Sequence, residues 1–141
     1  MKSILYLMLG FWLVVLNSSC HRCNDNENDC PVDISCTEIF VSIIVPLEFK
    51  NYSYNDLKYA QTIRKRDGNI LSIHYYLPLA LGPFYATIID DNEMEKVKKS
   101  GEPILFKVYN DLEEEIYSEE FIIGHDCCHV VKISGKDKII L

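Results

Sequence analysis

Apolar and polar residues alternate with a period of two along most of the chain after residue 36. In the segment TEIFVSIIV, residues 37–45, the apolar residues of one parity are Ile39, Val41, Ile43 and Val45. A period of two places these side chains on one face of an extended segment, which predicts a half-buried strand. Pro46 is expected to end that strand.

The same alternation recurs at intervals of about ten residues. It predicts further strands at residues 57–64, 70–77, 84–89, 104–109, 114–123 and 130–134, with a last short strand at 139–141. Asp67-Gly68 lies between two of these segments and favours a tight hairpin. Residues 90–101 are the one helical segment, with acidic residues first, lysines later and Gly101 last. Seven or eight short strands with one short helix predict an all-β fold, a single antiparallel β-sandwich.

The N-terminus has a different pattern. Residues 4–16 form an unbroken apolar run of 13 residues after Lys2, which is too short for a membrane span and has the length of a signal-peptide core. Ser18 and Ser19 precede Cys20, and the segment resembles the lipobox of bacterial lipoproteins, in which cleavage precedes a cysteine that carries acyl chains. Asn17 stands where that motif usually has leucine. We therefore expect a signal peptide over residues 1–19, lipidation (palmitate among the acyl groups) at Cys20, a polar tether over 20–35 and the sandwich over 36–141.

Charge narrows the choice of partners. Without Lys2, 13 basic and 21 acidic side chains remain, a net charge of −8. An acidic surface repels nucleic acid and anionic lipid head groups, so neither is an expected partner. Affinity for the membrane must therefore come from the acyl chains on Cys20. We expect a cell-envelope protein anchored to the outer membrane, facing either the periplasm or the cell surface.

Three segments carry a family resemblance. SCTEIFVSIIV, YATIIDD and FIIGHDCCHVVKISG together resemble a family of small bacterial lipoprotein domains. Their sandwich is similar to transthyretin-like and carboxypeptidase-regulatory-like (Ig-like) modules. The resemblance implies this fold and a lipid anchor, and it implies no settled activity.

The cysteines predict disulfide bonds. With Cys20 lipidated, Cys23, Cys30, Cys36, Cys127 and Cys128 remain, and an exported protein keeps disulfides. Because Cys127 and Cys128 are adjacent, each is expected to bond a distant partner, either Cys36 or Cys30. Cys36–Cys127 is the preferred pair, because Cys127 shares the parity of Val131 and Ile133, the expected core face. A loop of roughly 90 residues closed in this way stabilises by about 4 kcal/mol.

The segment GHDCCHV, residues 124–130, leaves an alternative open. His125, Cys127, Cys128 and His129 are zinc or copper ligand types, although alternate residues of an extended segment point to opposite faces. Catalysis is not expected, because nucleophile-elbow, metalloprotease, phosphate-loop and dinucleotide motifs are absent from the sequence. Tyr52, Tyr54, Tyr75 and Tyr76 are candidates for a binding surface. The sequence thus favours a non-enzymatic binding or accessory module without a cofactor, whose partner is an envelope protein or polymer.

Overall fold

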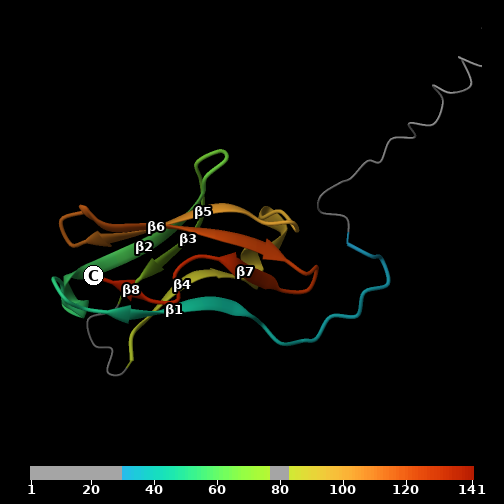
Figure 1. Ribbon diagram of the computed structural model, residues 1–141, viewed down its shortest axis with the longest axis horizontal. Coiled ribbons are helices and arrows are strands. Elements are labelled where there is room, and N and C mark those ends of the chain that lie inside the picture. Colours follow the sequence, from blue (N-terminus) through green and yellow to red (C-terminus); the bar gives the residue numbers. More distant parts are fainter. Residues whose placement is uncertain (1–29, 77–82) are drawn as a thin grey trace, which may run out of the picture.

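The computed structural model describes residues 30–76 and 83–141, and within them the chain forms two stacked β-sheets (Figure 1). The strands of the described part are β1 (Ser42–Glu48), β2 (Leu57–Arg64), β3 (Asn69–Tyr75), β4 (Tyr85–Asp90), β5 (Glu102–Asn110), β6 (Glu115–His125), β7 (Val130–Ser134) and β8 (Ile139–Ile140). Two short 3-10 helices, η1 (Tyr54–Asp56) and η2 (Asp91–Lys96), interrupt the strands. The predicted all-β sandwich is confirmed.

One sheet has five strands in the order β3-β2-β5-β6-β7, and the other has three in the order β4-β1-β8. All pairings in the larger sheet are antiparallel. In the smaller sheet β1 is antiparallel to β4 but parallel to β8. The parallel pair departs from the predicted antiparallel arrangement, because the chain crosses from the larger sheet to the smaller one between β7 and β8.

The core lies between the two sheets. Its largest fully buried side chains include Phe106 and Phe121, whose rings meet edge to face with centroids 6.4 Å apart. Burial of such rings and of the isoleucines around them supplies the main stabilising term of a domain this size. Thr62, fully buried in β2, donates a hydrogen bond through Oγ1 to the main-chain oxygen of Ile88 in β4. This bond joins the two sheets through the core.

Two element predictions need correction at their ends. The first strand begins at Ser42 instead of residue 37, and Ile39 is 68% exposed. Pro46 does not end the strand: it lies opposite Tyr85 within β1, and the pairing with β8 begins only at Leu47. A proline is tolerated here because its missing N–H falls where the ladder on that side has not begun.

The helical segment predicted over residues 90–101 is helical only over Asp91–Lys96, as the 3-10 helix η2, and Gly101 does not end it. Asp90 precedes it, and its side chain accepts a hydrogen bond from the N–H of Asn92 at 2.9 Å. Most of the remaining strand boundaries agree within two residues. Residue 77, the predicted end of the third strand, lies outside the described residues, and in the described part no helix has the length and apolar character needed to cross a bilayer.

Candidate functional site

The residues HDCCH form the end of the β6–β7 hairpin. His125 pairs with Val130 as the last rung of the ladder, and the N–H of Asp126 donates to the oxygen of His129 at 3.1 Å. The Asp126 carboxylate accepts two further main-chain bonds, from the N–H groups of Cys128 (2.9 Å) and His129 (2.7 Å). These bonds lower the pKa of Asp126. The carboxylate therefore closes a tight loop around the two cysteines.

Both cysteines of this loop are bonded to the segment that precedes β1. Cys30 is bonded to Cys127 and Cys36 to Cys128, so the two upstream cysteines are paired with the two downstream ones as predicted. The preferred assignment Cys36–Cys127 is wrong. It relied on Val131 and Ile133 facing the core, whereas these are 41% and 54% exposed and Val130 is buried.

The loop conformation also breaks the alternation on which the preferred assignment relied. Cys127 has a φ of +79°, the left-handed region that non-glycine residues seldom adopt. One residue in this conformation turns the chain, so side-chain alternation does not carry across the loop from β7. Cys127 is therefore almost fully buried beside His125 and Cys128 is half-buried.

A second set of bonds ties the same loop to η2 and to the approach to β1. The Asp91 carboxylate accepts from His129 Nδ1 (2.8 Å) and from the N–H groups of Val41 (2.8 Å) and Val130 (2.9 Å). Burial pushes the pKa of Asp91 up, but the bonds from His129, Val130 and Val41 outweigh it and the net pKa is lowered. His129 Nε2 lies 2.9 Å from Thr37 Oγ1.

Thr37, His129 and Asp91 therefore lie in series, in the order of a hydroxyl–imidazole–carboxylate triad. The Asp91 carboxylate here joins η2 to two other segments, the approach to β1 and the start of β7. Two of its three hydrogen-bond donors are main-chain N–H groups. We interpret this series as the polar anchor of the segment that carries the disulfides. The sequence analysis treated Asp91 only as one of the acidic residues at the start of the helical segment 90–101, and no local pattern distinguishes it from its acidic neighbours.

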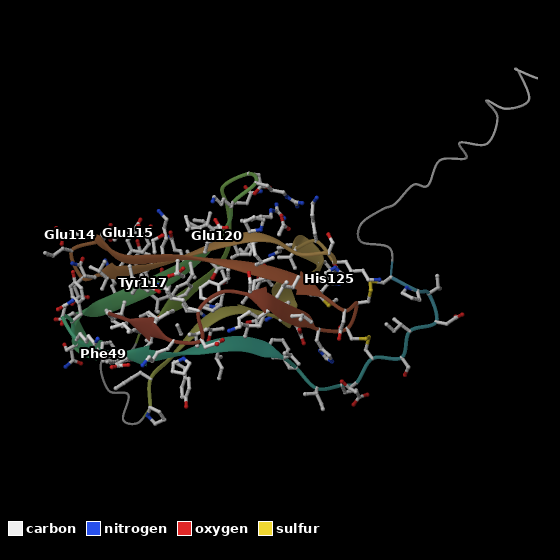
Figure 2. The ribbon with its side chains drawn as sticks, viewed as in Figure 1. Phe49, Glu114, Glu115, Tyr117, Glu120 and His125 are labelled. Atoms are coloured by element: carbon white, nitrogen blue, oxygen red, sulfur yellow. A yellow bond between two sulfur atoms is a disulfide. The ribbon has the colours of Figure 1, made fainter. Side chains whose placement is uncertain are left out.

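His125 is on the other side of the loop. Figure 2 shows it near the disulfides, at the end of the sandwich opposite Glu114 and Phe49. Its side chain lines a cavity of about 340 Å³ together with Cys30, Cys127, Met94 and Glu95. Burial, with a smaller contribution from Lys99, lowers the pKa of His125, so its imidazole is neutral at neutral pH. Nδ1 accepts the N–H of Cys127 at 3.1 Å.

The four residues of the metal alternative do not share one set of ligand atoms in the oxidised protein. The sulfur atoms of Cys127 and Cys128 are in disulfides with different partners. Both ring nitrogens of His129 already have partners, Nδ1 with Asp91 and Nε2 with Thr37. A different group, Cys30, His125 and Cys127, has its potential ligand atoms within 4.8 Å of one another.

The outer face of the five-stranded sheet presents a second candidate surface. Tyr75, Tyr59 and Tyr109 lie opposite one another on β3, β2 and β5. Their ring centroids are 5.9 Å and 4.8 Å apart, and we call these three residues the tyrosine row. A parallel apolar row contains Ile70, Ile63 and Leu105. The surface is therefore apolar where it reaches the edge strand β3.

The other tyrosines named from the sequence lie elsewhere. Tyr54 stacks on Phe84 at 4.3 Å and meets Tyr76 edge to face at 5.8 Å, so these two pack against the core. Tyr52 lines a separate pocket near the β5–β6 turn. Only Tyr75 of the four is on the outer face, and the strand register supplies its partners.

Cys20, the predicted lipidation site, and Cys23 lie outside the described residues. A scan against protein-family models and searches of curated proteins and of solved structures found no match to this chain. The resemblance to transthyretin-like lipoprotein domains therefore stays a prediction.

Proposed function

We propose that this protein is a lipid-anchored, non-enzymatic module of the cell envelope that binds an extended segment of a partner protein along β3. The observation that supports it best is the character of this edge strand. Among residues 30–76 and 83–141, β3 has β2 as its single strand neighbour, and its sequence NILSIHY contains no Asp, Glu, Lys or Arg. Its side chains Ile70, Ile73 and Tyr75 are 51%, 42% and 69% exposed.

Sheet edges in soluble proteins are normally protected by charge, proline or a bulge, because their free N–H and C=O groups pair readily with another strand. The opposite edge of the same sheet follows this rule, since β7 carries Lys132 in its centre. β3 has a register shift opposite Thr62–Ile63 but continues in regular register from Ser72 to Tyr75. An uncharged edge with regular register is suited to strand addition.

The rows on the outer face also favour an extended protein segment. A strand added beside β3 would place its alternate side chains next to Ile73 and Tyr75. It would extend the tyrosine row by one residue, and its contact with Ile73 would lie beside Gln61 of β2. Stacked tyrosines present ring edges and hydroxyl groups, and tyrosine is enriched at protein interfaces. Main-chain pairing would supply affinity and the rows would supply selectivity.

A displayed library of random peptides tests this binding mode for a partner segment of any sequence. We expect selected peptides to slow amide hydrogen exchange in β3, and Ile73→Lys to weaken their binding at least tenfold. Val131→Lys is the matched control, because Val131 is 41% exposed on β7 at the other edge. Equal loss in both variants, protection away from β3, or binding of a cell-wall glycan unaffected by Ile73→Lys would refute the proposal.

The anchor has its own test. The apolar N-terminal run and the small residues before Cys20 support lipidation at that cysteine. Cells fed a clickable palmitate analogue should label the wild-type protein, and Cys20→Ala should abolish the label. An unlabelled wild-type protein, or a labelled variant, would remove the lipid anchor from the proposal and leave the binding edge untouched.

A further inference from the structure

The cavity beside the β6–β7 loop contains an unusual concentration of metal-ligating side chains. Ligand atoms of Cys30, His125 and Cys127 lie within 4.8 Å of one another, and Met94 and Glu95 complete the wall. Two sulfur ligands of one ion, each about 2.3 Å from it, are at most about 4.6 Å apart. After reduction the two sulfur atoms must move apart to bind one ion, and the imidazole already has a ring nitrogen within 4.8 Å of both. What prevents this in the oxidised protein is the bond between the two sulfur atoms.

The neighbouring disulfide makes opening of that bond compatible with the fold. Cys36–Cys128 attaches the same segment to the same loop. With this second bridge closed, reduction of Cys30–Cys127 leaves Cys30 tethered six residues from its anchor point. The Asp91 bonds to Val41 and Val130 also hold the segment and the loop together. The two freed sulfur atoms therefore stay close to His125.

We propose that reduction of the Cys30–Cys127 disulfide converts this cavity into a copper(I) site, with the two thiolates and the His125 imidazole as ligands. The proposal is independent of the binding edge on β3. It also differs in its ligand set from the alternative based on residues 125–129, because it uses Cys30 and excludes Cys128 and His129.

The redox step needs a two-electron reductant, which in the cell is a dithiol. One thiolate of the reductant attacks a sulfur of the bridge, the mixed disulfide forms and the other cysteine leaves as a thiolate that takes up a proton. The second thiol of the reductant then resolves the mixed disulfide. The reductant ends as a disulfide, having given two electrons and two protons to Cys30 and Cys127. Binding of the ion releases both thiol protons.

The donor set favours copper(I) over harder ions. Thiolate and thioether sulfur prefer this soft ion, and the thioether of Met94 is at the wall of the cavity. Nδ1 of His125 already acts as an acceptor toward the Cys127 N–H, so this ring nitrogen carries the lone pair that a metal ligand needs. Coordination replaces the bond from the Cys127 N–H to Nδ1, so one neutral hydrogen bond is exchanged for a metal–nitrogen bond.

The test is a titration of the full chain with copper(I) against a chromogenic copper(I) chelator, before and after limited reduction by a phosphine that does not bind the ion tightly. Thiol mapping by mass spectrometry identifies the species in which Cys30–Cys127 is open and Cys36–Cys128 is closed, and the titration is done on that species. We expect one equivalent to bind at the site after reduction and none at this affinity before it. The reduced Cys36→Ser/Cys128→Ser variant keeps the proposed ligands but lacks the second bridge, so it should bind copper(I) more weakly than the wild type with Cys36–Cys128 closed, and still more tightly than a variant without Cys30 and Cys127. The reduced Cys30→Ser/Cys127→Ser variant keeps Cys36 and Cys128 and should bind copper(I) at least a hundredfold more weakly than the reduced wild type.

His125→Ala should lower the affinity at least tenfold, and far-ultraviolet circular dichroism of each reduced sample reports whether the sandwich persists. Residues outside the site, Cys20 and Cys23 included, are the same in all variants and cancel in the comparison. Equal binding by the oxidised protein, equal binding by the two double variants, or a reduced wild type that binds no copper(I) would overturn the proposal. A reduced chain that loses its β-sheet spectrum and does not recover it with copper(I) would do so too.

Discussion

The two disulfides close overlapping loops, because Cys36 lies inside the loop of Cys30–Cys127 and Cys128 lies outside it. This overlap predicts how the two bridges share their stabilisation. Cys30–Cys127 spans 97 residues and Cys36–Cys128 spans 92. Either bridge alone closes a loop that includes nearly the whole domain. Once one bridge is closed, the other bridge closes only a small additional ring. This ring runs from Cys30 along the chain to Cys36, across the Cys36–Cys128 bond, and back through Cys127 to Cys30.

In the chain-entropy model a loop of 92 residues stabilises by about 4.6 kcal/mol, and a ring of roughly seven residues by about 2.4 kcal/mol. Loss of either bridge from the wild type should therefore cost only about 2.4 kcal/mol, because the remaining bridge still closes the large loop. Loss of both should cost about 7 kcal/mol. That total is comparable with the entire free energy of unfolding of an ordinary domain, so the chain without either bridge is expected to be largely unfolded.

Equilibrium unfolding in urea measures these differences. The variants are Cys30→Ser/Cys127→Ser, Cys36→Ser/Cys128→Ser and the combination of all four substitutions. The first two should lose similar stability, and the fourfold variant should lose clearly more than the sum of their losses. Cys127 is almost fully buried whereas Cys36 is exposed, so a modest extra loss in the first variant reflects the buried hydroxyl.

Two results would refute this reasoning. One is a loss of about 4 to 5 kcal/mol on removal of a single bridge, because the large loop would then not be shared. The other is a fourfold variant whose loss equals the sum of the two single-bridge losses. Either outcome would mean that the bridges act mainly through native-state contacts around the β6–β7 loop rather than through the unfolded chain.

Two further predictions concern single positions. Gly135 has a φ of +129°, and a Cβ there would lie 2.2 Å from a ring carbon of Phe121. We expect Gly135→Ala to lower the free energy of unfolding, measured by heat or urea, by about 3 kcal/mol or more. Gly68→Ala is the control and should cost about 1 kcal/mol, because φ there is +73° and no atom lies within 4 Å of the added Cβ. Equal losses would contradict the steric argument. Folding lowers the pKa of Asp91, so the stability that this carboxylate contributes is present above its unfolded pKa of about 3.9 and is lost as the pH falls through the lower folded value. Asp91→Asn should therefore flatten the acid limb of a plot of unfolding free energy against pH. An unchanged acid limb would show that Asp91 does not contribute.

The period of two in the sequence predicts most of this fold, for a simple reason. Each strand of the sandwich has one face in the core, so burial and sequence alternate together. The β2 strand, Leu57–Arg64, and the β7 strand, Val130–Ser134, were predicted with their observed ends. The signal is weakest where burial is not alternating: residues 37–41 have the same pattern but lie in an exposed approach to β1.

The candidate site depends on features that alternation does not encode. On β7 the residue that faces the core is Val130 and not Val131 or Ile133, and the left-handed residue Cys127 keeps the alternation of β7 from predicting which cysteine is buried. Asp91 bonds segments that are 39 and 50 residues distant from it in the chain, and no local pattern reports such contacts. The tyrosine row likewise requires the register of β3, β2 and β5, which is set by tertiary pairing and not by the spacing of tyrosines.

The position of the two bridges has a mechanical consequence if Cys20 carries the lipid. Tension from the membrane enters the domain at Cys30, and the Cys30–Cys127 bond passes it directly to the loop between β6 and β7, two strands of the larger sheet. The weakly structured residues 31–41 are then bypassed. Reduction of this bond would transfer the load to Cys36–Cys128 and release six residues, up to about 20 Å of extended chain. The same thiol chemistry that forms the proposed copper(I) site would therefore also lengthen the tether, while the second bridge keeps β1 from carrying the load.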